Sequence, residues 1–436
     1  MHLKRYFSLA FLLFFCGCTK FEDAEMTDRN TFVHFFSSES NYVGVVAELD
    51  SDGGYIVSGD IRKENGESDA VIIKTDVRGH KVWEKIVPNG VINAIKPFPN
   101  GYILVGDSIQ MNTGALDVEL SELSNSYARL LLMDSQGNIT SQHITSGRIK
   151  IGDDTLTIDY HGSAFVQDPA GHVIMLGSYR VPGGNESTFV SAFDPANISD
   201  SLWYQSYQSL DHDLFNCRTL HVTPSSNLVW ASSMHTQAQN LSREFVGVSQ
   251  VKANSTFKTF TQFGERDTRN HSVEDLQRSP VGYCAIGTYT ETNGSNGNIY
   301  FFRLDASLNV IPDSERYIDG EELIRNGSLL DAASRTSSSS LDEGLAIAAT
   351  DDGYLLAGTL TSTPTVGNGG KDILLIKLDA FGSLVWNKLI GGSGDETVTS
   401  VRETSDKGFL ICGSNSINGL STIMLLKTDR NGNLDN

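Results

Sequence analysis

The chain of 436 residues carries 53 Asp and Glu against 33 Lys and Arg, which gives a formal net charge of −20. Binding to nucleic acid needs clustered Lys and Arg to neutralise phosphates. No basic run occurs, so we expect no nucleic-acid partner; an acidic excess of this size instead favours solubility.

The N-terminus has the layout of a secretory signal. Met1–Arg5 ends in two positive charges, an apolar stretch runs from Tyr6 to Phe15, and Cys16-Gly17-Cys18 follows. This pattern predicts a signal peptide at residues 1–17, and the apolar stretch is too short to cross a bilayer as a helix.

The end of this signal, Phe15-Cys16-Gly17-Cys18, resembles the lipobox of bacterial lipoproteins. The resemblance implies cleavage before Cys18 and attachment of lipid to its thiol. Residues 18–30 would then form a lipidated tether that, at ~3.4 Å per residue, keeps the folded part within roughly 40 Å of a membrane. A plain secreted protein is the alternative.

The rest of the chain repeats one motif. Asp52–Gly59 reads Asp-Gly-Gly-Tyr-Ile-Val-Ser-Gly, and Asp351–Gly358 reads Asp-Asp-Gly-Tyr-Leu-Leu-Ala-Gly. The residue just after this turn recurs seven times, 47 to 71 residues apart, at Tyr55, Tyr102, His172, Leu228, Tyr283, Tyr354 and Phe409. A period of this length indicates a repeat architecture.

Each unit holds up to four short runs rich in Val, Ile, Leu and aromatic residues, bounded by Gly, Asp and Asn. Such runs are typical of strands, and seven units of four antiparallel strands predict an all-β, seven-bladed β-propeller over residues 31–436. The last unit lacks its fourth strand, whereas Thr31–Ser37 matches a fourth strand and precedes the first unit. We therefore expect the N-terminal strand to complete the last blade and to remove an open edge.

Long insertions are expected on one face of the ring. The links from strand 1 to 2 and from strand 3 to 4 are short, and the face they form is called the short-turn face. The links from strand 2 to 3 and between blades form the long-loop face. Loop insertions are predicted at residues 108–127, 140–158 and 312–341, the last with a short helix within Asp319–Arg335. Because long loops often carry function, we expect a partner to bind the long-loop face.

For several repeated residues we expect a structural role rather than a binding role. Asp residues at the turn before the fourth strand are expected to cap that turn rather than bind calcium, although the spacing after Asp429 is similar to a calcium loop. These residues are Asp76, Asp134, Asp379 and Asp429. Trp83, Trp203 and Trp386 begin outer strands and predict packing between blades, whereas Trp230 predicts a core position.

Residues that often carry chemistry form no recognisable pattern. Three cysteines remain after the lipidated one, an odd number without close spacing, and we expect small buried core residues: Cys217, Cys284 and Cys412. No zinc-type spacing joins the histidine-rich positions, which are Asp211-His212-Asp213, His221, His235 and His271. Two acidic pairs lie in predicted loops, Asp153-Asp154 and Glu321-Glu322. We therefore expect no catalytic residue, metal or cofactor, and only Cys18 is proposed as a modified site.

The repeat Asp-Gly-Gly-Tyr…Gly…Leu-Ile-Lys-Thr-Asp…Gly…Val-Trp-x-Lys resembles the uncharacterised propeller lipoproteins of Bacteroidetes. The resemblance implies a propeller at the outer membrane, lipid-anchored on the cell surface, with the periplasmic face as the alternative. The first functional interpretation is a non-enzymatic scaffold subunit that binds an outer-membrane protein partner. The alternative is a surface glycan-binding or glycan-cleaving lipoprotein for nutrient uptake, which exposed aromatic residues would favour; the visible candidates are Tyr127, Tyr179 and Tyr289.

Overall fold

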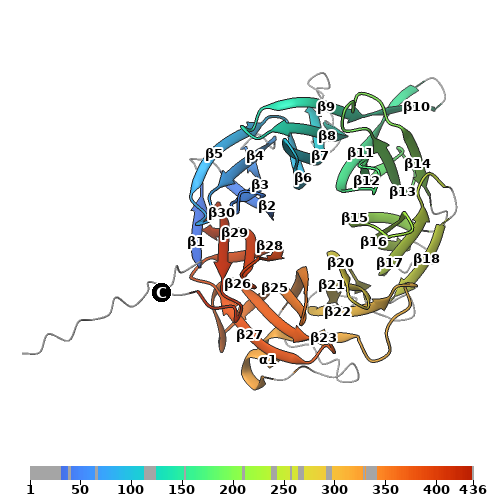
Figure 1. The fold of residues 1–436 in the computed structure, drawn as a ribbon. Helices are drawn as coiled ribbons and strands as arrows, with labels where there is room; N and C mark the ends of the chain where they lie inside the picture. The colour runs from blue at the N-terminus through green and yellow to red at the C-terminus, as the bar shows by residue number, and fades with distance from the viewer. Residues whose placement is uncertain are drawn as a thin grey trace, which may run out of the picture.

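The computed structural model describes residues 31–434, except 38–40, 64–66, 112–123, 152–153, 209–211, 237–242, 256–257, 264–269, 291–296, 328 and 330–340. Its strands form seven antiparallel sheets around a central axis (Figure 1). This arrangement confirms the predicted seven-bladed propeller. The signal, Cys18 and the tether lie outside the described residues.

The first four blades follow each other along the chain. Blade 1 comprises β2 (Asn41–Leu49), β3 (Tyr55–Arg62), β4 (Ser68–Thr75) and β5 (Lys81–Val87). Blade 2 comprises β6 (Gly90–Phe98), β7 (Gly101–Met111), β8 (Ser124–Asp134) and β9 (Ile139–Thr145). Blade 3 comprises β10 (Gly147–Ile151), β11 (Asp154–Gln167), β12 (Val173–Arg180), β13 (Glu186–Phe193) and β14 (Trp203–Tyr207). Blade 4 comprises β15 (His212–Val222), β16 (Asn227–Thr236), β17 (Arg243–Lys252) and β18 (Lys258–Phe263).

The remaining blades include a divided inner strand and the helix. Blade 5 comprises β19 (Asn270–His271), β20 (Asp275–Ser279), β21 (Gly282–Thr290), β22 (Gly297–Asp305) and β23 (Arg316–Ile318). Helix α1 (Gly320–Asn326) leads to blade 6, which comprises β24 (Asp342–Thr350), β25 (Gly353–Thr363), β26 (Val366–Asp379) and β27 (Leu384–Ile390). Blade 7 comprises β28 (Asp395–Glu403), β29 (Phe409–Ile417), β30 (Leu420–Thr428) and β1 (Phe32–Phe36).

Strand β1 lies in the position of a fourth strand. It pairs antiparallel with β30, with Phe32 opposite Lys427. The ring of Phe32 lies 5.9 Å from the ring of Tyr55 in blade 1. Outer-strand tryptophans make the same contact elsewhere in the ring, since Trp83 lies 6.0 Å from Tyr102. Phe32 thus packs against the next blade as those tryptophans do.

The other tryptophans and the cysteines pack as predicted. Trp386 of blade 6 lies 6.2 Å from Phe409 of blade 7, which confirms packing between blades. Trp230 is fully buried in the core. The three cysteines are buried thiols, which confirms their interpretation as core residues: Cys217, Cys284 and Cys412.

Close approach between blades depends on glycine. A Cβ added to Gly44 in β2 would lie 2.2 Å from the carbonyl oxygen of Gly413 in the preceding blade. The same holds at Gly344, where the carbonyl oxygen of Gly287 would be 2.4 Å away. Only glycine leaves room for this contact. In both strands the residue after the glycine is a β-bulge. The register shifts between Gly44 and Val46 in β2, and between Gly344 and Ala346 in β24.

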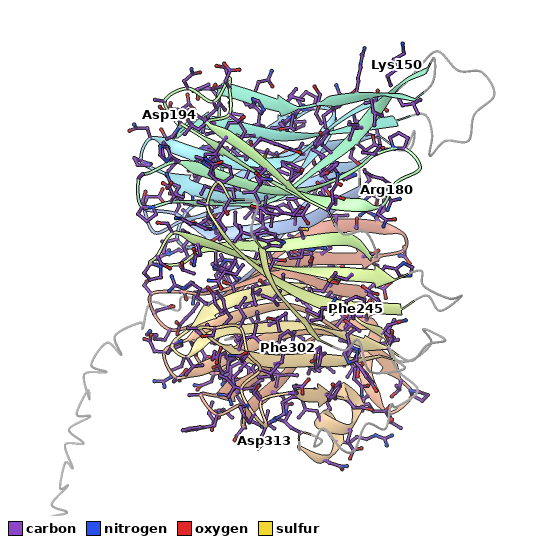
Figure 2. The ribbon with its side chains drawn as sticks, turned by 90° about the vertical axis from the view of Figure 1, so that its right-hand side faces the viewer. Lys150, Arg180, Asp194, Phe245, Phe302 and Asp313 are labelled. Atoms are coloured by element: carbon purple, nitrogen blue, oxygen red, sulfur yellow. The ribbon has the colours of Figure 1, made fainter. Side chains whose placement is uncertain are left out.

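The insertions differ in part from expectation. Residues 140–158, predicted as a loop, instead form most of β9, all of β10 and the start of β11, so blade 3 gains a fifth strand. The residues of β10 alternate between charged and apolar side chains, which suits an edge strand. Lys150 in β10 and Arg180 lie on one side of the ring, opposite Asp194 (Figure 2).

The insertion at 312–341 begins later than predicted, because residues 316–318 form the fourth strand of blade 5. The expected helix is present but short: α1 starts after Asp319, whose side chain accepts from the Glu322 amide, and ends at the left-handed Gly327. Among the described residues no helix is long and apolar enough to cross a membrane. The middle of the 108–127 insertion lies outside the described residues.

The recurring Asp turns are structural, as predicted. The carboxylate of Asp429 accepts hydrogen bonds from the backbone amides of Asn431 and Asn433, each at 2.8 Å, and from the Asn433 side chain. Asp76, Asp134 and Asp379 accept from the same two backbone positions. These local hydrogen bonds account for the recurrence of Asp at this turn.

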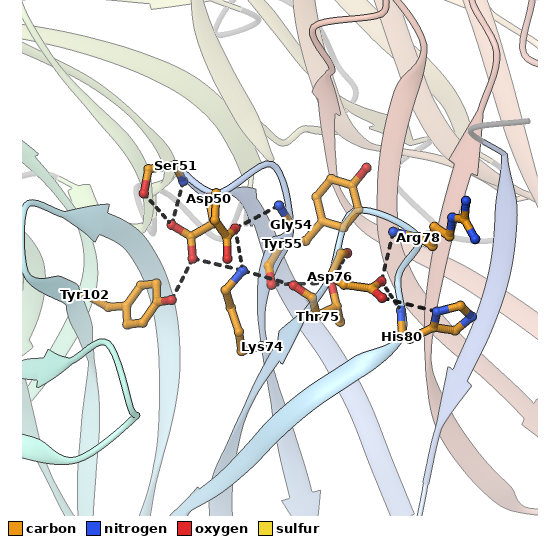
Figure 3. Close-up of polar contacts among 11 residues, drawn as sticks. Asp50, Ser51, Gly54, Tyr55, Lys74, Thr75, Asp76, Arg78, His80 and Tyr102 are labelled. Carbon is orange, nitrogen blue, oxygen red and sulfur yellow. Dashed lines mark hydrogen bonds and ion pairs between the residues drawn. The ribbon is translucent and has the colours of Figure 1, made fainter. Parts of the chain in front are cut away.

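A buried lysine in the third strand of a blade pairs with an aspartate in the turn between the first two strands. Lys74 Nζ lies 2.8 Å from Asp52 and 3.1 Å from Asp50, and it donates to the Thr75 carbonyl (Figure 3). Tyr102 of blade 2 donates to Asp50 at 2.6 Å, which ties the network to the next blade. Lys377 with Asp352 and Lys427 with Asp406 repeat the same ion pair at 2.7 and 3.0 Å.

Candidate functional site

The inner strands enclose a cavity of about 470 Å³ along the central axis. Its wall takes residues from all seven blades, through β2, β6, β11, β15, β20, β24 and β28 and the end of β3. We call this cavity the central channel. It follows from ring closure, since each blade contributes one inner strand.

Many of the side chains that line the channel are charged. They are Glu48, Asp60, Arg62, Lys96, Arg218, Glu274, Asp275 and Arg402. Four of them are Lys or Arg and four are Asp or Glu, so the channel gathers as many cations as acids although the chain as a whole is acidic. Low-dielectric walls strengthen the field of such charges on a ligand.

Two of the four cations are neutralised within the wall. Arg402 Nε and Nη2 donate to one oxygen of Glu48 at 3.0 and 2.7 Å. Burial opposes the charge of Arg402, but Glu48 outweighs it and raises the pKa of the guanidinium. Arg218 lies 3.3 Å from Glu274.

The other two cations have no carboxylate within ion-pair distance among the described residues. Lys96 Nζ donates to the Phe165 carbonyl at 3.3 Å and lies 5.5 Å above the Phe165 ring. The surrounding wall lowers the pKa of Lys96 by desolvation; Glu48 opposes this and Arg402 adds to it. Arg62 is exposed to the channel at the end of β3. Both remain available to a ligand.

Histidine in the channel is held as a neutral ring. His221 Nε2 lies 2.7 Å from the Leu276 carbonyl oxygen. Burial lowers the pKa of His221 to about 4, and the nearby cations Lys96, Arg278 and Arg402 contribute. Its neighbour Asp275 is also built into the wall, because it accepts from the Ile347 amide and the Gln277 side chain.

Asp60 differs from the other acids of the channel. Its Oδ1 atom is buried and has no hydrogen-bond partner within the described part of the chain. Burial raises the pKa of Asp60 to about 7, Arg62 opposes the shift, and Asp107 adds to it. Near neutral pH this carboxyl group can therefore hold or release a proton.

The residues singled out in the sequence lie mostly elsewhere. Glu321 pairs with Arg325 on α1, away from the channel. Asp153 lies outside the described residues, and Asp154 begins β11. The two tyrosines expected on loops, Tyr179 and Tyr289, are instead buried, since both lie in strands that pack into the core.

Tyr127 and His271 also lie outside the channel. Tyr127 borders a second cavity of about 500 Å³ beside Arg148, between blades 2 and 3. His271 is buried among the rings of Tyr289, Tyr300 and Tyr317. Across the described ranges no three His, Cys, Asp or Glu side chains group as metal ligands.

Comparison with known proteins shows the fold and no more specific relationship. No protein-family model and no curated protein matches the sequence. The chain is similar to an ulvan lyase, from a new family of polysaccharide lyase, bound to -[GlcA(1-4)Rha3S]-. The TM-score is 0.51 at 7% identity, over 91% of this chain and 96% of that one.

A second structure of that lyase gives a TM-score of 0.51 at 6% identity, over 92% and 96% of the two chains. A Trypanosoma rangeli sialidase aligns with a TM-score of 0.43 at 8% identity, over 91% of this chain and 58% of that one. The class that the fold defines is thus the β-propeller, in a form that a polysaccharide lyase shares along nearly its whole length.

Proposed function

We propose that the protein binds a carbohydrate chain bearing carboxylate or sulfate groups in the central channel. The observation that carries this proposal is the pair of cations without a carboxylate within ion-pair distance among the described residues, Arg62 and Lys96, in a site whose other two cations are each paired with a glutamate. A carbohydrate hydroxyl suits the polar wall, and an acidic group suits the two free cations.

Two considerations favour this function over the scaffold role predicted first. The similar ulvan lyase acts on a polysaccharide, and it shares the ring at full length. The channel also offers about 470 Å³, enough for part of a glycan chain, in the range usual for small-ligand sites. The scaffold role rested on long loops, whereas part of the 140–158 insertion is regular strand.

The location predicted from the N-terminus is part of the same proposal. A protein anchored through Cys18 would present the channel to glycans close to an outer membrane. Support for the anchor comes from the signal pattern alone, since residues 1–17 precede the lipobox cysteine.

The test is calorimetric titration with three probes of equal length: a β(1-4)-linked glucuronate oligosaccharide, the cello-oligosaccharide that differs only at C6, and its sulfated form. The acidic probes should bind at least about tenfold more tightly than the neutral one, since a charge-assisted contact contributes about 1.5–3 kcal/mol. Arg62→Gln and Lys96→Gln should each remove most of this preference.

Arg325→Gln, on the outer helix α1, is the matched control, because it removes the same kind of charge outside the channel. Its titration should equal that of the wild type. Equal binding of neutral and acidic probes, or binding unchanged in both channel variants, would contradict the proposal.

A further inference from the structure

In four other blades, the residue equivalent to Asp60 makes a hydrogen bond to the next blade. Asp60 lies five residues after the repeat marker, as do Asp107, Ser233, Thr288 and Ser414. Each of those four side chains accepts a hydrogen bond from a backbone amide of the next blade's inner segment. The N···O distances are 2.7 Å for Gly162 to Asp107 and 2.9 Å for Gly44 to Ser414.

Asp60 does not make that bond. Its Oδ1 atom is buried without a partner, although a buried polar atom left unpaired costs about 1–3 kcal/mol. The residue lines the channel beside Arg62, two positions along the same face of β3. Because Asp60 lines the cavity and no described residue satisfies its buried Oδ1 atom, its carboxyl group is free to bond to a ligand there.

The charged groups around Asp60 limit the state in which it binds. Asp107, on β7 of blade 2, is held as an acceptor by the Gly162 amide and lies 3.2 Å from His161. Asp69 on β4 is paired with Lys63 at 2.9 Å. Arg62 attracts a negative charge at Asp60, whereas Asp107 and burial oppose it. The net balance favours the neutral carboxyl group below neutral pH.

We propose that Asp60 recognises the glycan as a neutral carboxylic acid, donating its proton in a hydrogen bond to a sugar oxygen beside the acidic group that Arg62 holds. This inference rests on the proposed function. It makes Asp60 a specificity-determining residue and makes glycan affinity depend on pH. With a pKa of about 7, affinity should fall about 30-fold from pH 5.5 to pH 8.5 as the donor proton is lost.

The experiment titrates the β(1-4)-linked glucuronate oligosaccharide into the mature protein at both pH values. Asp60→Asn keeps a donor of similar shape that never ionises, so its affinity should match the wild type at pH 5.5 and stay level at pH 8.5. Asp60→Ala should bind weakly at both. Asp351→Asn, a control at an exposed carboxylate, should keep the wild-type profile.

The outcomes separate this inference from the proposed function. If no probe binds at either pH, the proposed function fails. The probe could instead bind, with its affinity lowered by Arg62→Gln, while Asp60→Asn keeps the full pH dependence. The pH dependence would then belong to another group such as Lys96, and the inference would fail. Wild-type affinity in Asp60→Ala would also overturn it. Urea unfolding of each variant confirms that it is folded.

Discussion

The buried lysine of blade 7 provides a sharp test of what holds the repeat together. Lys427 is 2% exposed, and its Nζ atom lies 3.0 Å from both carboxylate oxygens of Asp406. Asp406 also accepts from the Gly408 amide and the Thr404 hydroxyl. Burial alone would raise the pKa of Asp406, but these hydrogen bonds outweigh it and lower the pKa. We expect Asp406→Ala to destabilise the protein strongly.

The magnitude follows from the partner left behind. Removing one member of a buried ion pair typically costs about 3–5 kcal/mol, because the other charge stays buried without compensation. Asp406 itself is 36% exposed, so water can reach part of the site, and the lower end of that range, about 3 kcal/mol, is expected. Lys427→Met added to Asp406→Ala should recover part of the loss.

The assay is urea unfolding at pH 7, with the free energy of unfolding extrapolated to water. Asp351→Ala is the matched control, because Asp351 is 88% exposed and pairs with the exposed Lys407. Such a surface pair contributes about 0–1 kcal/mol. If the two variants differ by less than about 0.5 kcal/mol, the buried pair does not stabilise the blade and the reasoning is wrong.

Three further predictions concern Asp60, the anchor and the N-terminal strand. Between pH 3.8 and about 7 the folded state keeps a proton on Asp60 that the unfolded state loses. The free energy of unfolding should therefore fall by at most about 4 kcal/mol as the pH rises through this window, and urea unfolding of Asp60→Asn should not show this fall. Cys18→Ser should move the protein from washed membranes to the soluble fraction without changing its melting temperature. Deleting Thr31–Ser37 should cost more than about 3 kcal/mol, since it removes buried Phe36 and exposes β30, whereas deleting Lys20–Asp28 should not; equal melting temperatures would contradict a structural role for β1.

The architecture was readable from the sequence because local chemistry repeats. Turn residues, outer tryptophans and apolar runs recur in register, and each is fixed by its immediate neighbours. Asp429, for example, needs only the amides two and four residues later to form its turn. Features that depend only on neighbouring residues can be predicted without knowing the fold.

The buried ion pairs could also have been predicted from the sequence, because both members of each pair recur in the repeat. Asp52 and Lys74 are 22 residues apart, and Asp406 and Lys427 are 21 apart, so both members recur in the repeat. Recurrence at matched spacing indicates a contact between strands. The extra strand β10 left a weaker trace, since Ile149 and Ile151 alternate with charged residues over only five positions.

The channel could not be predicted in this way, because its partners come from opposite ends of the chain. Arg402 and Glu48 are 354 residues apart, and only ring closure brings them together. The unpaired Oδ1 of Asp60 is likewise invisible in sequence, where Asp60 and Asp107 occupy the same position of their repeats. Only the structure shows that one bonds to the next blade and the other does not.

The bulge in the inner strands connects the repeat to the site. Register shifts place a bulge at Val45 in β2, at Asn93 in β6 and at Thr399 in β28. A bulge reorients the side chains that follow it, and the residue three positions later lines the channel in each case: Glu48, Lys96 and Arg402. In β2 the residue before the bulge, Gly44, makes the close contact with the preceding blade, and the residue three positions after the bulge, Glu48, lines the channel. The bulges thus fix where Glu48, Lys96 and Arg402 stand, and the charges of these side chains decide which ligands the channel can take.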